Sequence, residues 1–211
     1  MTTAYTFGKS LAPLGNDAVE GLAYYVNPRR SYARTAYDRT HTFVQSYVYE
    51  LPFGKGKPWL QEGVASWFLG GWQVTGVLSL MTGIPINFVA STGALNTPGN
   101  TNSPNLNGKV NFLHGIDTAL WFDTSNFSAP AAGQFGNLGR YTTDGPGFFN
   151  LDASLFRHFR ITERWDLELR AEGYSSTNTP QFGNPNSTFG AASFGHVTSA
   201  GGNRTSNSAQ K

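Results

Sequence analysis

Serine, histidine and carboxylate side chains, the groups of nucleophilic catalysis, come close together in one stretch of the sequence. Ser154 lies between Asp152 and His158, and a hydroxyl activated by a histidine base is the pattern of ester and lactone hydrolases. These residues alternate with apolar ones, so they point from one face of a single strand and are spread along it. The sequence also lacks a Gly-x-Ser-x-Gly elbow. Ser154 and His158 are therefore catalytic candidates without the spacing of a triad.

A row of carboxylates follows at Asp166, Glu168 and Glu172. Glu168 with Glu172, or Asp166 with Glu168, could form a carboxylate pair for glycoside cleavage. Alternate residues on a strand face lie about 6.5–7 Å apart at the backbone, which is within the reach of either glycosidase spacing. Arg170 stands among them, and a mixed-charge face turned to water explains the row equally well. We therefore expect a chain without catalytic residues. If it is an enzyme, the residues favour a hydrolase of esters, lactones or glycosides, with Glu168 as the candidate in this row.

Aspartates in the middle of the chain offer ligands for calcium. Asp117, Asp123 and Asp144 supply hard oxygen atoms and have asparagines nearby, although their order is not that of an EF-hand loop. The four histidines are scattered without the spacing of a metal site. Calcium is the one cofactor that the sequence allows, and no other is expected.

Aromatic side chains among polar residues of the same region suggest a ligand surface. Trp121, Phe122 and Tyr141 could stack on the rings of a glycan or of another small molecule. The cluster at Trp121 and Phe122, together with Phe127, also suggests that part of this region folds back and packs. Ligand stacking and ordinary loop packing are both open at this point.

The candidate catalytic groups lie on segments whose side chains alternate between apolar and polar. In residues 148–159 one parity is apolar from Phe149 to Leu155. Residues 165–172 repeat the pattern after the polar link 160–164, which predicts a hairpin. In a soluble sandwich the polar face would meet water. In an outer-membrane barrel it would line the lumen while the apolar face met lipid, and alternation alone fits both.

Further strands are predicted at residues 40–51 and 70–80, with residues 86–90 continuing the second strand past a bulge. Residues 59–66 are expected to form a short surface helix or a loop. Residues 91–147 are rich in Asn, Thr, Gly, Pro and Ser, which favour turns. A segment this long with so little regular structure is either functional or mobile.

Composition limits the classes of function. Charged residues make up 13% of the chain, against about 25% in a typical domain. The formal net charge is +2 and the basic residues are spread out, so no surface for nucleic acid is visible. There is no cysteine, which excludes disulfides and thiolate metal sites. No run of about 18 apolar residues predicts a transmembrane helix, and the first residues lack the pattern of a secretory signal.

Six short motifs follow one another along the chain. They are YDRTH (37–41), YELPFGKG (49–56), GGWQ (70–73), GPGFFNLD (145–152), RITER (160–164) and NTPQFGNP (178–185). In this order they resemble the C-terminal part of the large TonB-dependent receptors of the acidobacterial type, which carry an N-terminal carboxypeptidase-regulatory-like domain. The resemblance covers roughly residues 27–200.

This resemblance implies a protein of the outer membrane of a Gram-negative bacterium. Short turns at residues 53–57 and 160–164 would face the periplasm, and residues 91–147 and 179–196 would lie outside the cell, in keeping with the loop lengths of such barrels. The family imports bulky nutrients, commonly siderophores or glycans, with energy that TonB relays to a plug domain. The implied partners are outer-membrane lipid, the plug and remaining barrel of a larger receptor, and a small-molecule or glycan ligand.

The chain departs from the family pattern in three places. The plug and most of the barrel are missing, residues 174–177 (YSST) are too polar for a lipid-facing row, and residues 201–211 replace a closing strand with a terminal aromatic. About four convincing strands and two weaker ones are fewer than the roughly eight of the smallest membrane barrels. The chain is thus expected to be a receptor segment, a part of an oligomer, or a soluble β-rich domain of this ancestry.

We therefore predict an all-β fold, an antiparallel meander of long strands that forms a partial transmembrane-type β-barrel with long loops. Residues 1–36 are expected to be irregular, residues 37–196 to form the barrel segment with its long loop 91–147, and residues 197–211 to be disordered. The predicted function is that of a non-catalytic segment of an outer-membrane TonB-dependent receptor or transporter. A soluble extracytoplasmic hydrolase and a glycan-binding module are the alternatives.

Overall fold

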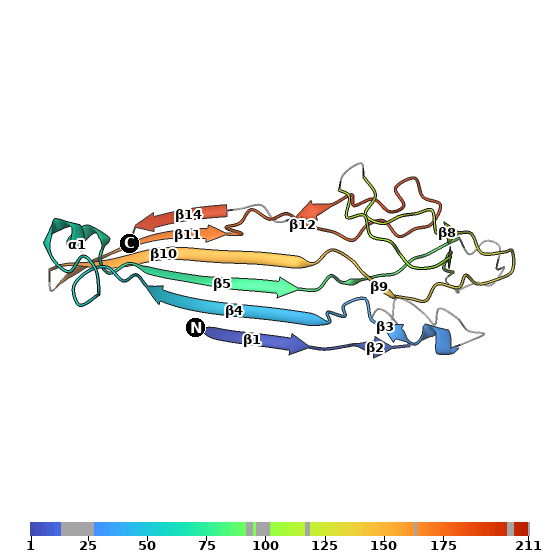
Figure 1. Cartoon of the computed structure of the whole chain (residues 1–211), viewed down its shortest axis with the longest axis horizontal. Coiled ribbons are helices and arrows are strands. Elements are labelled where there is room, and N and C mark those ends of the chain that lie inside the picture. The colour runs from blue at the N-terminus through green and yellow to red at the C-terminus, as the bar shows by residue number, and fades with distance from the viewer. Residues whose placement is uncertain are drawn as a thin grey trace.

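Six long strands form one antiparallel sheet in the computed structural model of the chain (Figure 1). They are β1 (Thr2–Phe7), β4 (His41–Glu50), β5 (Gln73–Met81), β10 (Phe148–Thr162), β11 (Trp165–Tyr174) and β14 (Thr205–Gln210). Their order in the sheet is their order along the chain, so the predicted antiparallel meander of long strands is confirmed. The structure describes residues 1–13, 28–91, 95, 102–116, 119–162, 164–201 and 205–210.

The lengths of these strands match those of strands that cross a membrane. β4, β5 and β11 have 10, 9 and 10 residues, and a bilayer is crossed by about 9–11 residues of a tilted strand. β10 is longer, with 15 residues, because it continues into the predicted link 160–164. The register shifts there, between Arg160 and Thr162, so the turn of the hairpin is shorter than the sequence predicts.

The register places side chains of like character on the same face of the sheet. Leu151 of β10 lies opposite Leu78 of β5, whereas the next residue, Asp152, lies opposite Val77. The apolar face carries Tyr5, Phe43, Tyr47, Tyr49, Val74, Leu78, Leu80, Phe149, Leu151, Leu155, Phe159, Leu167 and Leu169. The polar face carries mainly Thr42, Ser46, Gln73, Thr75, Ser79, Asn150, Asp152, Ser154, His158, Glu168, Arg170 and Glu172.

The hydrophobic core of the described residues lies outside the six long strands. Its side chains are Ile86, Phe88, Leu95, Trp121, Phe122, Phe127, Leu138, Tyr141, Phe194 and Val197. A soluble protein buries one face of a sheet against a second layer. Here none of the large apolar side chains on the apolar face is buried, and the sheet is a single layer in Figure 1. The sheet is therefore a wall whose apolar face is left open to its surroundings.

One end of this wall, which we call the α1 end, holds the connection between β4 and β5. The connection contains α1 (Gly63–Leu69), close to where the surface helix is predicted, and lies beside the turn of the β10–β11 hairpin (Figure 1). Gly54 has φ of 107° and approaches the end of α1 so closely that a Cβ atom there would lie 2.7 Å from Gly70 Cα. No helix in the described part of the chain is long and apolar enough to span a membrane.

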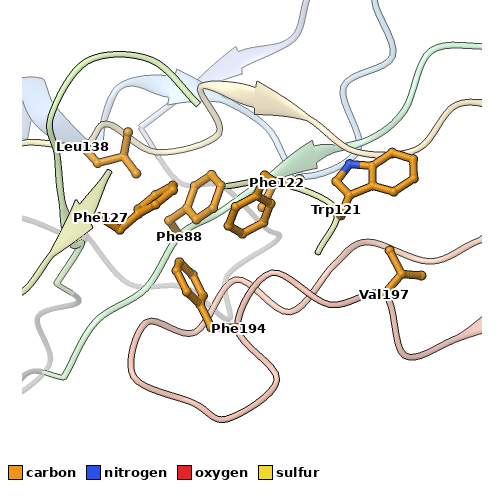
Figure 2. Close-up of a cluster of buried hydrophobic side chains, with 8 residues drawn as sticks. Phe88, Trp121, Phe122, Phe127, Leu138, Phe194 and Val197 are labelled. Carbon is orange, nitrogen blue, oxygen red and sulfur yellow. The ribbon is translucent and has the colours of Figure 1, made fainter. Parts of the chain in front are cut away.

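The opposite end, the loop-rich end, contains the other connections and several short ladders. These elements are β2 (Leu11–Ala12), η1 (Pro28–Ser31), β3 (Ala33–Arg34), β6 (Pro85–Ile86), β7 (Asn105–Leu106), β8 (Phe127–Ser128), β9 (Thr143–Asp144), β12 (Gln181–Phe182) and β13 (Ala200–Gly201). Trp121, Phe122 and Phe127 all belong to the cluster of buried side chains there (Figure 2), so the predicted packing of these aromatics is confirmed.

Both ends of the chain differ from the sequence-based expectation. In the segment 1–36, expected to be irregular, β1 pairs with β4 along all six of its residues and β2 pairs with β3, while residues 14–27 lie outside the described residues. In the segment 197–211, expected to be disordered, β13 pairs with β12 and β14 pairs with β11, while residues 202–204 and 211 lie outside the described residues. These strands are specified by their neighbours, because β propensity depends on tertiary context.

A buried carboxylate joins three segments of the loop-rich end. Asp38 is 3% exposed. It accepts hydrogen bonds from the backbone N–H of Ser10 (2.8 Å) and from Nε of Arg34 (2.6 Å), and Arg34 also lies 2.7 Å from Asp144. Burial disfavours the charged carboxylate, but the hydrogen bonds from Arg34 and Ser10 outweigh burial and hold the pKa of Asp38 below its ordinary value.

We expect the loop-rich end to lose stability in acid through Asp38. A carboxylate whose pKa is lowered by folding stabilises the fold above its unfolded pKa of about 3.9, and this stabilisation is lost as the pH falls through the lower folded pKa. Asp38→Asn should weaken this end at neutral pH and flatten the pH dependence. Near-ultraviolet circular dichroism of the aromatic cluster, recorded across this range, measures the effect. Glu62→Gln changes an exposed carboxylate and is the control; a pH profile of Asp38→Asn identical to that of the wild type would contradict the assignment.

Candidate functional site

The polar face of β10 and β11 carries a row of alternating charges. Nε2 of His158 lies 3.8 Å from the Glu168 carboxylate across the hairpin. Arg170 lies between two carboxylates, 3.2 Å from Glu168 and 3.4 Å from Glu172, and its guanidinium lies 5.5 Å from the centre of the Phe156 ring. Arg170 bridges the two glutamates of this row. The result is a hydrophilic surface suited to contact with water and polar solutes.

Ser154 and His158, the candidate nucleophile and base, do not meet. The hydroxyl of Ser154 lies 2.6 Å from the hydroxyl of Thr75 in β5. His158 is four positions further along the same strand, which corresponds to about 13 Å, well beyond the hydrogen bond that a nucleophile and its base share. The cross-strand partner Thr75 was missed by the sequence analysis, because alternation within β10 carries no information on the register with β5.

One candidate carboxylate pair, Glu168 with Glu172, is occupied by an arginine, and in the other, Asp166 with Glu168, Asp166 lies 3.6 Å from Arg160. A glycosidase leaves the space between its two carboxylates for the sugar and the attacking water. Between Glu168 and Glu172 this space holds the guanidinium of Arg170. The arrangement therefore fits a structural charge row better than a glycosidase site.

The polar run at residues 174–177, unsuited to a lipid-facing row, folds across the polar face. β11 ends at Tyr174, and Ser175 follows with φ of 46°. The backbone N–H of Ser175 donates to Asp152 and its hydroxyl donates to Asn150, each at 2.8 Å. This run therefore does not continue the strand.

Of the three aspartates predicted as calcium ligands, Asp117 lies outside the described residues, and Asp123 and Asp144 each have a separate partner. The carboxylate of Asp123 accepts the backbone N–H of Ser125 at 2.9 Å, and the hydrogen bonds from the backbone and hydroxyl of Ser125 hold the pKa of Asp123 below its ordinary value. Asp144 pairs with Arg34. Within the described ranges, no three His, Asp or Glu side chains are grouped as a metal site would require.

The aromatic residues predicted to bind a ligand are part of the protein core. Trp121, Phe122 and Tyr141 are 8%, 0% and 4% exposed. The ring of Trp121 packs edge to face against His114 at 4.9 Å, and Figure 2 shows Phe122 beside Phe88. A sugar could stack on these rings only after their neighbours had moved, so the structure gives no support to ligand binding there.

The combination of an open apolar face, a hydrophilic face and strands of membrane-crossing length agrees with a comparison to known families. The chain matches the family described as outer membrane beta barrel domain over residues 1–206. It belongs to this family. Neither the curated proteins nor the solved structures contain a match. As an outer membrane β-barrel domain, the protein is located in the bacterial outer membrane, and its apolar face meets membrane lipid.

Proposed function

We propose that this outer membrane β-barrel domain is a non-catalytic segment of a TonB-dependent receptor or transporter for a bulky nutrient, a glycan or a siderophore. The six motifs that resemble such receptors support this proposal. The observation that carries it is the mainly polar face, which extends across β4, β5, β10 and β11 and on which Arg170 pairs with Glu168 and Glu172. A wall of this kind suits the lumen through which a large polar solute passes.

The two ends of the wall suggest its orientation. Barrels of the outer membrane have short turns on the periplasmic side and long loops outside the cell. The α1 end holds the β10–β11 turn and the β4–β5 connection, whereas the longer connections β1–β4, β5–β10 and β11–β14 and the buried cluster lie at the loop-rich end (Figure 1). We therefore assign the α1 end to the periplasm and the loop-rich end to the cell surface, where it would meet the nutrient first.

The sheet also implies further strands. β1 and β14 are the two edges of the six-stranded sheet, and each edge presents unpaired backbone groups. In hydrocarbon such groups cost several kcal/mol each, and the smallest barrels have about eight strands. The natural partners of β1 and β14 are the remaining strands of a larger receptor barrel, which would also enclose a plug.

The transport proposal predicts that a bacterial strain lacking the gene for this chain loses energy-dependent uptake of one nutrient class. Labelled ferric siderophores and labelled oligosaccharides are the probes, and a protonophore should abolish the same uptake in the wild type. Unchanged uptake of both probes in the deletion strain would refute transport. Uptake that depends on the gene but survives the protonophore would refute TonB dependence.

Complementation of the deletion strain tests the polar face itself. Arg170→Ala leaves Glu168 and Glu172 without their shared cation and should reduce uptake. Arg164→Ala, an exposed arginine at the hairpin turn, removes the same charge outside the row and is the matched control. Equal uptake by the two complemented strains would count against the polar face as the transport surface.

A further inference from the structure

α1 carries an apolar surface that no other part of the described chain covers. This surface, the α1 patch, consists of Trp59, Leu60, Val64, Trp67, Phe68 and Leu69, whose exposed fractions run from 42% for Leu60 to 75% for Val64. α1 has no buried residue and no charged side chain. Contiguous exposed apolar surfaces of this kind mark contacts with a partner or with a membrane.

The helix is too short to be stable in water on its own. Isolated helices of fewer than about 12–15 residues are marginal, and α1 has 7 residues. Its N-cap residue, Glu62, makes no side-chain capping hydrogen bond. α1 therefore depends on its surroundings, which are the sheet on one side and whatever meets the α1 patch on the other.

Aromatic contacts make the α1 patch continuous with the apolar face of the sheet. The ring of Trp67 lies 5.6 Å from that of Phe159, and Trp72 lies 6.5 Å from the same ring. Phe159 shares the apolar face with Leu155. Trp165, at the start of β11 on this face, is 72% exposed. Since the apolar face meets lipid in this family, the α1 patch borders the same lipid.

Arg157 fastens α1 to the sheet. It lies on the apolar face but is only 8% exposed. Its Nη1 donates to the carbonyl oxygen of Phe68 at 2.7 Å, and its guanidinium lies 4.0 Å from the centre of the Phe159 ring. The Phe68 carbonyl is at the C-terminal end of α1, where a cation is favoured. An arginine on a lipid face costs about 2–4 kcal/mol at the midplane but only about 0–1 near the interface, so Arg157 and α1 together mark the interfacial level.

We propose that α1 is an interfacial anchor, which lies on the lipid side of the barrel wall with the α1 patch inserted between the head groups and acyl chains of the periplasmic leaflet. Tryptophan is enriched at this level of the membrane. Lys55, exposed in the turn before α1, supplies a positive charge for phosphate head groups. Arg157 is a positioning residue that holds the helix against β10. The inference rests on the proposed orientation of the wall.

Site-directed spin labelling tests the anchor directly, because the chain has no cysteine of its own. Single labels are placed by Val64→Cys on α1, by Leu155→Cys on the apolar face and by Ile116→Cys at the loop-rich end. The whole chain is reconstituted in phosphatidylethanolamine and phosphatidylglycerol vesicles. The accessibility of each nitroxide to oxygen, which dissolves in lipid, is compared with that to a water-soluble nickel chelate.

The ratio of oxygen to chelate accessibility should be several-fold higher at position 64 than at position 116, since an interfacial helix lies about 5–10 Å into the head-group boundary. Adding Arg157→Ala to Val64→Cys should lower that ratio towards the aqueous value; an unchanged ratio would overturn the positioning role of Arg157. A label at position 64 as open to the chelate as that at 116 would overturn the anchor, as would a label shielded from both quenchers, which would indicate a protein contact. The label at position 155 distinguishes a failure of the proposed function from a failure of the anchor. It must be accessible to oxygen if the wall lies in lipid, whether or not α1 is inserted.

Discussion

Phe122→Ala should destabilise the loop-rich end by about 3–5 kcal/mol, the usual effect of deleting a buried aromatic ring. Phe122 is 0% exposed. Its ring lies 5.2 Å from that of Phe88, 5.5 Å from that of Phe127 and 5.3 Å from that of Phe194. Phe88 and Phe127 belong to the β5–β10 connection and Phe194 to the β11–β14 connection, so a cavity at this position loosens the contacts that hold the two connections to one another.

Proteolysis of the vesicle-bound chain measures this change. When opening is fast, the rate of cleavage follows the open population, so cleavage of residues 102–138 should accelerate by roughly a hundredfold or more. Leu113→Ala removes a side chain that is 53% exposed in the same segment and should change stability by no more than about 0.5 kcal/mol. The strand signal in far-ultraviolet circular dichroism should persist in both variants, since the cluster lies outside the sheet. Equal cleavage rates, or loss of the sheet together with the cluster, would contradict this separation.

Alternation locates β4, β5, β10 and β11 in the sequence because each of these strands separates two different environments. β1 has no such pattern. All six of its residues are exposed at an edge of the sheet, so neither face selects for apolar or polar side chains. The sequence of β14, TSNSAQ, has no apolar alternation. The pairing of both strands is a property of their neighbours, and a pattern within the segment cannot report it.

The sequence predicts which residues share the polar face, but it does not predict which of them contact one another. Parity alone puts Ser154 and His158 on one side of β10. The register between strands, which parity does not give, decides that Ser154 meets Thr75. Arg157 shows the same limit from the other side. By parity, Arg157 interrupts a row of apolar residues. Its contact with α1 is evident only in the structure, where α1 packs over it.

Aromatic residues in a polar loop have two opposite explanations, and the sequence does not choose between them. Trp121 and Phe122 suit a ligand surface and suit a core equally well. The choice depends on Phe88, from a distant part of the same connection, and on Phe194, from the β11–β14 connection. Packing between residues far apart in the sequence produces no pattern with a spacing of two or four residues. The sequence therefore suggests that a core forms at the loop-rich end but does not show which residues form it.

The sharpest test of the wall is a pair of neighbouring residues on opposite faces of β5. Leu78 lies on the apolar face between Gln45 and Leu151, and Val77 lies on the polar face between Ser46 and Asp152. Leu78→Arg puts a charge into lipid and should destabilise the membrane-inserted chain by about 2–4 kcal/mol. Val77→Arg puts the same charge beside the carboxylate of Asp152 and should change stability by no more than about 0.5 kcal/mol.

Urea titration of the chain in phospholipid vesicles, followed by tryptophan fluorescence, gives the two free energies of unfolding. Both variants introduce an arginine at neighbouring positions of the same strand, so a general intolerance of β5 to arginine would affect both alike. The free energies of unfolding of the two variants differ only if one face of β5 meets the membrane and the other meets water. Equal destabilisation would remove the assignment of faces, and a chain that stays monomeric without detergent and tolerates Leu78→Arg would show that this sheet folds in water. A large loss confined to Leu78→Arg is the result that a lipid-facing wall requires.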